Sequence, residues 1–134
     1  MKGALPESLH ELTVADVMLA TPKTLPAATT VAEAREALAN QHVQMLLLID
    51  GTAFHGAVTN IPNDADPSSP VSEHVDAAAE TLAPTESAEV AYERTSLSRH
   101  RRVVVLGANG DLLGLVCLNP TLTGFCTGRP GDPC

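Results

Sequence analysis

The sequence contains few aromatic residues, and this shortage limits how its core can be built. Aromatic residues make up 2% of the 134 residues: there is no Trp, one Tyr (Tyr92) and two Phe (Phe54 and Phe125). Hydrophobic residues as a whole nevertheless reach 44%. The core must therefore be built mainly from Leu, Val and Ala. A chain of this length is long enough for one compact body that buries roughly two thirds of its unfolded surface.

Long apolar runs and a cysteine framework are also missing. No apolar run approaches the roughly 20 residues of a membrane-spanning helix, and the opening MKGALPESLHEL lacks the apolar segment of a signal peptide. Cys117, Cys126 and Cys134 all lie late in the chain, so no disulfide framework links its two halves. Cys117 falls in an apolar run and is expected to be a small core residue. We therefore expect a cytoplasmic protein with no membrane segment.

Positive charge is scarce as well, because 8 Lys and Arg stand against 16 Asp and Glu for a formal net charge of -8. We therefore do not expect general nucleic-acid binding, because affinity for the phosphate backbone needs a cationic surface. Half of the cations nevertheless fall within nine residues, at Arg94, Arg99, Arg101 and Arg102. This cluster suits a small anion better than a polymer. The alternative is a solvated face, or pairing with acids of a second subunit such as Glu86, Glu89 or Glu93.

A duplication is the main feature that the sequence does contain. Residues 46–59, LLLIDGTAFHGAVT, return as residues 103–117, VVVLGANGDLLGLVC. The pair Thr24-Leu25 returns as Thr81-Leu82 at a spacing of 57, and Gly56 returns as Gly114 at a spacing of 58. Two copies at this period indicate a pair of like units and not a solenoid, which needs about three or more repeats. Each unit alone would bury too little surface, so the halves are expected to share an interface.

Each copy predicts the same order of elements. In the first copy a short extended piece precedes a helix over 31–40, whose capping box is Thr30 and Glu33. A hairpin follows, with strands over 45–49 and 54–59 and a turn at Asp50-Gly51. The second copy predicts a helix from Ser87 with Ala88, Ala91, Tyr92 and Leu97 as its apolar residues, then strands over 103–106 and 112–118. Residues 8–18 predict a lead-in helix or two short turns, with possible capping boxes at Ser8 and Glu11 and at Thr13 and Asp16. Residues 60–70 can hold at most a turn or two of helix.

These motifs together resemble the cystathionine beta-synthase (CBS) domain pair, or Bateman module. The resemblance is carried by the openings TVADVM (residues 13–18) and VSEHV (residues 71–75), the runs HVQMLLLIDG and HRRVVVLGANG, and the motifs GAVT and GLVC. It implies an α+β (α/β-like) fold of two intertwined β-α-β-β-α repeats with pseudo-twofold symmetry. The expected boundaries are a lead-in over 1–12, a first repeat over 13–66, a linker over 67–70, a second repeat over 71–126 and a flexible tail over 127–134.

The resemblance also implies a ligand. Members of the family bind AMP, ADP, ATP or S-adenosylmethionine between repeats, assemble as homodimers and regulate an attached or partner protein without catalysis. Their nucleotide motif runs from the hairpin glycine to a Thr or Ser, which can bond a phosphate, and then to an Asp or Asn, which accepts both hydrogen bonds of a ribose diol. Thr59 matches the hydroxyl in the first copy. Pro62 occupies the acidic position there, whereas Cys117 and Pro120 replace both groups in the second copy.

Two functional interpretations follow from these departures, beside a third in which the cluster over residues 94–102 binds an anion or a nucleic acid. In the first, the chain is a stand-alone, non-enzymatic regulatory module and a homodimer, which senses an adenine nucleotide weakly through Thr59, Arg101 and Arg102. Arg102 holds the place of the basic residue that the family often carries before the apolar strand, and Asn60, Asn63, Asp64 or Asn119 are alternatives for the lost acid. In the second, the pair has kept the fold as a dimerisation or protein-interaction scaffold. Two histidines, His42 and His100, precede equivalent strands without metal-ligand partners.

Overall fold

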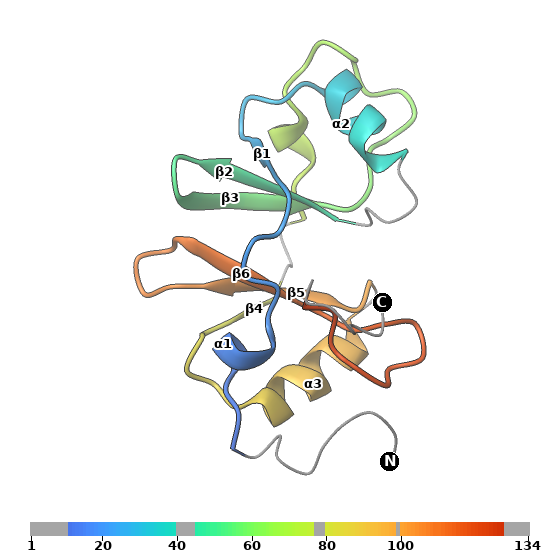
Figure 1. Ribbon diagram of the computed structural model, residues 1–134. Coiled ribbons are helices and arrows are strands. Elements are labelled where there is room, and N and C mark those ends of the chain that lie inside the picture. The colour runs from blue at the N-terminus through green and yellow to red at the C-terminus, as the bar shows by residue number, and fades with distance from the viewer. Residues whose placement is uncertain (1–10, 40–44, 77–79, 99, 128–134) are drawn as a thin grey trace. The chain divides into compact units, whose positions relative to one another are not determined.

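Two three-stranded mixed sheets, each accompanied by helices, form the fold (Figure 1). The computed structural model describes residues 11–39, 45–76, 80–98 and 100–127. One sheet has the order β1-β2-β3 and the other β4-β5-β6. In chain order the elements are α1 (Val14–Val17), β1 (Thr24–Pro26), α2 (Val31–Leu38), β2 (Leu46–Asp50), β3 (Ala53–Val58), the 3-10 helix η2 (Val71–His74), β4 (Thr81–Leu82), α3 (Ala88–Leu97), β5 (Arg102–Leu106) and β6 (Leu112–Cys117).

The two copies of the sequence have the same strand register. Thr24 pairs with Leu47 in the parallel pair β1–β2, and 57 residues later Thr81 pairs with Val104 in β4–β5. In the antiparallel hairpins Gly56 lies opposite Leu48, and Gly114 lies opposite Val105. A bulge follows at the same place in each hairpin, and the turn glycines Gly51 and Gly110 have φ of 67° and 86°. The predicted duplication, hairpins and α+β class are confirmed.

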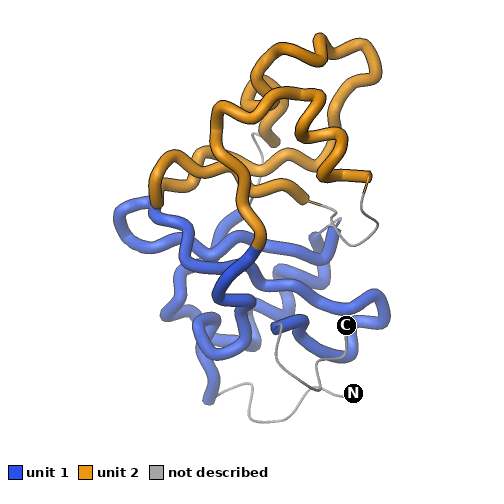
Figure 2. Tube along the Cα trace, turned by 45° about the horizontal axis from the view of Figure 1, so that its top comes forward, with its two compact units in different colours: residues 1–22, 80–134 blue, residues 23–79 orange. Residues whose placement is uncertain are grey.

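The chain divides into two compact units whose boundaries differ from those of the sequence repeats (Figure 2). Unit 1 comprises residues 1–22 and 80–134, and unit 2 comprises residues 23–79. The opening of the first copy therefore belongs to the unit that contains the second hairpin. The repeat boundaries predicted at 13–66 and 71–126 describe the copies along the chain, whereas each compact unit combines segments of both copies.

Backbone hydrogen bonds show how the opening segments are exchanged. In unit 1, Leu19 and Leu115 bond each other in both directions, with N···O distances of 2.8 and 3.1 Å. In unit 2, the amide of Asp76 donates to the carbonyl of Ala57 at 2.7 Å. Each opening segment thus extends the sheet edge at the hairpin of the other copy. The expectation of intertwined repeats agrees with this connectivity.

Each unit has its own aliphatic core. In unit 2, α2 and η2 cover one face of the sheet, and the buried residues are Val31, Ala34, Leu46, Leu48, Val58 and Val71. In unit 1, α1 and α3 contribute to the equivalent cluster of Val14, Leu82, Ala91, Val103, Val105 and Val116. Cys117 is 6% exposed, as predicted for a small core residue. Leu, Val and Ala supply nearly all of this burial, in keeping with the shortage of aromatic residues.

The buried face of α3 differs from the prediction. Leu97 was expected on the apolar face but is 81% exposed, and Thr95 is fully buried together with Ala88 and Ala91. The reason is geometric: at about 100° per residue, Leu97 lies on the opposite side of the helix from Ala88, whereas Ala91 and Thr95 lie on the same side. Within the described part of the chain, the hydroxyl oxygen of Thr95 is buried without a hydrogen-bond partner.

Replacing this buried threonine is expected to stabilise the protein. Thr95→Val keeps the side-chain shape and removes the unpaired hydroxyl, whose desolvation costs on the order of 1 kcal/mol. We expect the free energy of unfolding in urea to rise by about 1 kcal/mol. Thr85→Val, at an exposed position in the same unit, serves as the control and should leave stability unchanged. A Thr95→Val protein no more stable than the wild type would contradict the proposed cost of this hydroxyl.

The segments that follow the two hairpins contain turns and no helix among the residues described. Turns occupy residues 63–64 and 67–68 after β3, and residues 120–121 after β6. The short helix expected at the end of each repeat is therefore not formed there. Prolines explain this difference, because Pro62, Pro67 and Pro120 lack the amide hydrogens that a helix needs beyond its first turn.

The capping box of α2 is formed as predicted. Thr30 donates from its backbone amide to Oε1 of Glu33 at 3.0 Å, and the amide of Glu33 donates to the Thr30 hydroxyl at 3.2 Å. The hydrogen bonds from the Thr30 backbone and then from its hydroxyl lower the pKa of Glu33 below its ordinary value. The box at Thr13 and Asp16 is also present in α1, at a Thr13 N to Asp16 Oδ2 distance of 2.8 Å.

A pH dependence of stability follows from the lowered pKa of Glu33. Because the folded-state pKa is depressed, the contribution of this carboxylate is fully present above its unfolded pKa and is lost as the pH falls through the folded pKa. Glu33→Gln is expected to reduce the loss of stability between neutral and acidic pH, measured as the urea midpoint across that range. Glu36→Gln, exposed on the same helix, is the control. Equal acid sensitivity of both variants would argue against the capping box as the cause.

Candidate functional site

The first-copy motif ends in a turn that is held by Arg35. Thr59 directly follows β3 and is half-buried, and Pro62 is exposed. From α2, Nη2 of Arg35 donates to the carbonyl of Pro62 at 2.7 Å and to that of Asn63 at 3.2 Å. This clamp fixes the backbone at the position where the family motif has its acid. One sign of this role is visible in the sequence, because Arg35 is the one cation of α2, whose other residues are mainly Ala and Glu.

The second-copy motif ends in a turn that satisfies its own polar groups. Asn119, 6% exposed, accepts at Oδ1 from the amides of Thr123 at 2.8 Å and Gly124 at 3.3 Å. Its Nδ2 donates to the hydroxyl of Thr123 at 2.8 Å. Both polar atoms of the amide group are therefore used within the turn. Asn119 is thus unsuited to replace the acid that Pro120 removed, although the sequence allowed it.

Aromatic residues fix this second turn to α3. The hydroxyl of Tyr92 donates to the carbonyl of Leu122 at 2.9 Å. The rings of Tyr92 and Phe125 meet edge to face with a centroid distance of 6.3 Å, a favourable arrangement for two aromatic side chains. Leu122 itself has φ of 61°, a left-handed conformation. Two of the three aromatic residues of the chain thus support the turn that ends the second motif.

Arg101 ends the connection between α3 and β5, and Arg102 is the first residue of β5. Arg101 has φ of 56°, its amide donates to the carbonyl of Ser98 at 3.1 Å, and its carbonyl accepts from the amide of Leu118 at 3.0 Å. The Nε atom of Arg101 is buried without a hydrogen-bond partner among the residues that the structure describes. Arg102 pairs with Cys117 in the sheet, and its Nη1 donates to the carbonyl of His100 at 2.7 Å. Both arginines therefore adjoin the end of the second motif.

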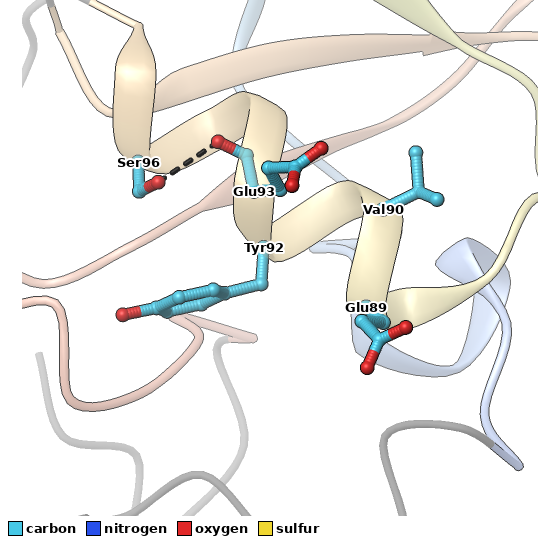
Figure 3. Close-up of a pocket in the computed structure, with 5 residues that line it drawn as sticks. All are labelled: Glu89, Val90, Tyr92, Glu93 and Ser96. Atoms are coloured by element: carbon cyan, nitrogen blue, oxygen red, sulfur yellow. Dashed lines mark hydrogen bonds between the residues drawn. The ribbon is translucent and has the colours of Figure 1, made fainter. Parts of the chain in front are cut away.

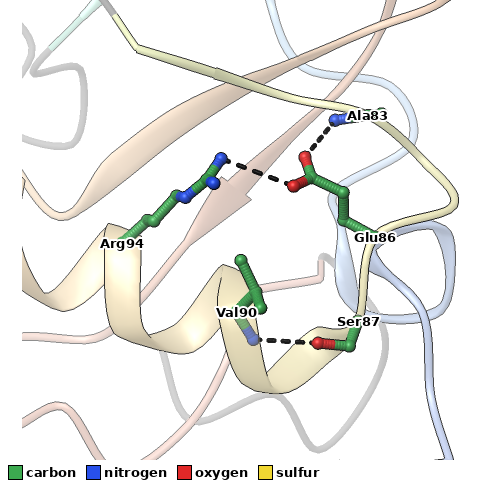
Figure 4. Close-up of polar contacts among 5 residues, drawn as sticks. All are labelled: Ala83, Glu86, Ser87, Val90 and Arg94. Atoms are coloured by element: carbon green, nitrogen blue, oxygen red, sulfur yellow. Dashed lines mark hydrogen bonds and ion pairs between the residues drawn. The ribbon is translucent and has the colours of Figure 1, made fainter.

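Arg94 has a partner within its own chain (Figure 4). Its Nη1 lies 3.5 Å from Oε1 of Glu86, and the two side chains are 42% and 32% exposed. Glu86 also accepts from the amide of Ala83 at 2.8 Å. A pair this exposed contributes at most about 1 kcal/mol. Glu86 thus has a cationic partner in its own chain, and the pairing of the cluster with acids of a second subunit stays a prediction. Arg99 lies outside the described residues.

The exposed side of α3 forms a surface hollow without cationic side chains (Figure 3). Its lining residues are Glu89, Val90, Tyr92, Glu93 and Ser96. The two carboxylates at this hollow repel phosphate groups. An anionic nucleotide is therefore disfavoured here.

The predicted binding residues are distributed over both compact units. Arg101 and Arg102 are neighbours in unit 1, beside Cys117 and Leu118. Thr59 belongs to unit 2. Within the described ranges no group of three or more His, Cys, Asp or Glu side chains could hold a metal ion. His42 falls among the residues that are not described.

Comparison with solved structures identifies the fold. No protein-family model matches the chain, and no curated protein resembles it in sequence. The CBS-pair protein CBSX2 from Arabidopsis thaliana superposes with a TM-score of 0.68 at 20% identity, over 79% of this chain and 88% of that one. CBSX2 in complex with AMP gives 0.66 at 21% identity, over 84% and 92% of the two chains. A CBS domain pair/ACT domain protein from Thermotoga maritima gives 0.67 at 17% identity, over 80% and 90%.

The chain has the fold of a CBS domain pair. The resemblance seen in the sequence is confirmed at the level of architecture across most of the chain. The structure describes Thr59 directly after β3 in the first copy and Arg102 as the first residue of β5 in the second. None of the helices in the described ranges combines the length and the apolar character needed to cross a bilayer.

Proposed function

We propose that this protein is a non-enzymatic regulatory module that binds an adenine nucleotide weakly through Thr59, Arg101 and Arg102. The observation that carries the proposal is the pair of arginines at the end of the second motif of a CBS-pair fold, in a protein of net charge -8. Guanidinium groups suit phosphate because their planar donors match its oxygens. The AMP complex of CBSX2 supports the choice of ligand.

Weak affinity follows from the two prolines. Neither Pro62 nor Pro120 can accept a side-chain hydrogen bond, and the amide of Asn119 is already used. A hydrogen bond to a charged acceptor is worth about 1.5 to 3 kcal/mol. We therefore expect a dissociation constant of tens of micromolar or weaker, which corresponds to about 7 kcal/mol or less. AMP, ADP, ATP and S-adenosylmethionine are the ligands to compare.

The proposed regulatory action depends on differential binding. A ligand shifts a conformational equilibrium only by the difference between its affinities for the two states. We propose that the protein acts in the cytoplasm as a homodimer and controls a partner protein that the chain does not name. Leu97, which is 81% exposed, is an apolar residue that a second copy would cover. A single-chain mass in sedimentation equilibrium would reject the homodimer.

The second candidate function is a scaffold for dimerisation or protein interaction that binds no nucleotide. Three observations favour it: the lost acids at Pro62 and Pro120, the buried Cys117 in place of a hydroxyl, and the closed turn around Asn119. In this case the motif segments serve only to complete the fold. The two candidates make opposite predictions for nucleotide binding.

Thermal unfolding in the presence of each nucleotide distinguishes the two candidates. A ligand at about 100 times its dissociation constant stabilises the folded state by about 2.7 kcal/mol, which for this chain length raises the melting temperature by roughly 5 to 10 °C. We expect such a shift with about 5 mM AMP, given a dissociation constant of about 50 μM. Arg102→Ala should reduce it, and Arg94→Ala should not. No shift with any of the four compounds would favour the scaffold.

A further inference from the structure

We propose that Cys126 is a redox modification site, at which a disulfide to Cys134 forms and opens with the thiol–disulfide balance of the surroundings. The inference goes beyond the proposed function, because neither nucleotide binding nor a scaffold requires it. Cys126 follows β6 in unit 1 and is half-buried. It is disulfide-bonded in the structure.

The partner of Cys126 is identified by elimination. The sequence contains three cysteines, Cys117, Cys126 and Cys134. Cys117 is 6% exposed and is a thiol that takes part in no disulfide. Because the bond of Cys126 lies within one chain, Cys134 is the cysteine that remains. We therefore assign Cys134, which lies outside the described residues, as the partner.

Cys117 lies opposite Cys126 and is the competing partner. Leu118 and Phe125 form an antiparallel bridge, and the amide of Cys126 donates to the carbonyl of Cys117 at 2.7 Å. In such a pair, opposite residues have Cα atoms about 5.5 Å apart when they are hydrogen-bonded. That spacing is within the range of a disulfide. The absence of Cys117 from the bond is therefore not explained by distance along the strands, and substitution of Cys117 separates the two pairings.

The proposed bond closes a short loop inside one unit. Residues 127–133, with the sequence TGRPGDP, separate the two cysteines. Gly and Pro favour turns, which bring the ends of such a segment together. The stabilisation by a disulfide grows with the length of the loop that it closes. This loop is short, and we therefore expect the bond to contribute little to folding.

A bond that contributes little to folding is suited to reversible chemistry. In the reducing cytoplasm, where the proposed function places the protein, disulfides are usually transient and either catalytic or redox-sensing. Exposed disulfides are also more readily reduced than structural ones. Cys126 is half-buried, whereas Cys117 is buried in the sheet. The accessible sulfur of the pair is therefore the one that carries the bond.

The position of Cys126 determines what its oxidation changes. Its amide holds it against Cys117 at the end of β6. The preceding residue, Phe125, packs edge to face against Tyr92 of α3 at a centroid distance of 6.3 Å. These contacts belong to the backbone of Cys126 and to its neighbour, and none of them needs the disulfide. Oxidation therefore tethers the chain that follows Cys126 and leaves the second turn as it is.

The reaction is a two-electron thiol–disulfide exchange with a small-molecule disulfide such as oxidised glutathione. The thiolate of one cysteine attacks the disulfide of the reagent, forms a mixed disulfide and releases one glutathione thiol. The second cysteine then displaces the other glutathione, so that the bond between Cys126 and Cys134 forms. The two cysteine protons end on the two released thiols. Reduced glutathione drives the same steps in reverse.

Counting thiols tests the proposal on the wild type, Cys117→Ala and Cys126→Ser. Each protein is equilibrated with oxidised or with excess reduced glutathione, alkylated in denaturant and weighed by mass spectrometry with fragmentation. The oxidised wild type should carry one alkylated cysteine, Cys117, and the reduced wild type all three. Cys117→Ala should change from none to two. Cys126→Ser should form no internal disulfide in either buffer.

Three results would overturn the proposal. Alkylation of Cys134 in the oxidised wild type would show that Cys126 pairs with Cys117 or with another molecule. A bond that persists in excess reduced glutathione would show that it is not reversible. A melting temperature that falls by more than about 10 °C on reduction would mark a structural disulfide, whereas we expect a change within about 4 °C. No nucleotide is needed, so these results are independent of whether AMP binds.

Discussion

Gly114→Ala is expected to destabilise the protein by about 3 kcal/mol. A Cβ atom at this position would lie 2.6 Å from Sδ of Met18 and 2.8 Å from the backbone carbonyl oxygen of Leu19. The carbonyl cannot move aside, because the two hydrogen bonds between Leu19 and Leu115 hold the opening segment against β6. The added methyl group therefore separates the exchanged segment from its hairpin. Urea unfolding followed by circular dichroism measures the loss.

Two further glycines test this explanation. Gly56→Ala should also destabilise the protein, because its Cβ atom would lie 2.7 Å from Cγ1 of Val75 at the equivalent contact in unit 2. Gly107→Ala is the matched control, since its Cβ atom would meet Leu113 at 3.4 Å and no strained φ is required. Its stability should stay within about 1 kcal/mol of the wild type. A Gly114→Ala protein as stable as Gly107→Ala would refute the close packing of the opening segment.

Pro62→Asp is expected to raise the affinity for AMP by about tenfold to a hundredfold. The change restores the acceptor of the nucleotide motif three residues after Thr59. The turn is already held by Arg35, whose Nη2 donates to the carbonyl oxygen of residue 62 at 2.7 Å. A hydrogen bond to a charged group contributes about 1.5 to 3 kcal/mol, and each 1.4 kcal/mol is a factor of ten in affinity. Calorimetric titration of the variant with AMP gives the change directly.

Pro120→Asp is the matched control for this gain. The same substitution in the second copy follows Cys117, which offers no hydroxyl, and falls in a turn whose geometry is set by Asn119 and Tyr92. We expect its affinity for AMP to remain near that of the wild type. Equal gains in the two variants would show that a negative charge near either motif suffices. No gain in Pro62→Asp would show that the ribose is not bound at this position.

The sequence predicted most of the fold because its signals were local and occurred twice. Each of these signals involves only neighbouring residues, and the structure contains all of them. They are the capping boxes at Thr13 and Thr30, the turn glycines Gly51 and Gly110, and the two apolar hairpins. The residues of each compact unit could not be predicted from a period of 57 or 58 residues, because a repeat length does not say which hairpin an opening segment meets. The Leu19–Leu115 pairing settles it.

The candidate site was less predictable because its chemistry depends on side-chain partners. Thr59, Arg101 and Arg102 were identifiable by alignment with a family motif, but their assignment as one binding set remains a prediction. The clamp of Arg35 joins residues far apart in the sequence, and the closed turn of Asn119 depends on side-chain hydrogen bonds that no sequence pattern predicts. The left-handed backbone of Arg101 has no sequence signature at all, since its residue type argues against it.

Calorimetric titration of the wild-type protein with AMP tests the central claim most directly. The account predicts saturable binding with a dissociation constant of tens of micromolar or weaker, corresponding to about 7 kcal/mol or less. Absence of binding heat with AMP in the millimolar range, at two temperatures so that a zero enthalpy is not mistaken for no binding, would contradict it. The CBS-pair fold would then serve as a scaffold and not as a sensor.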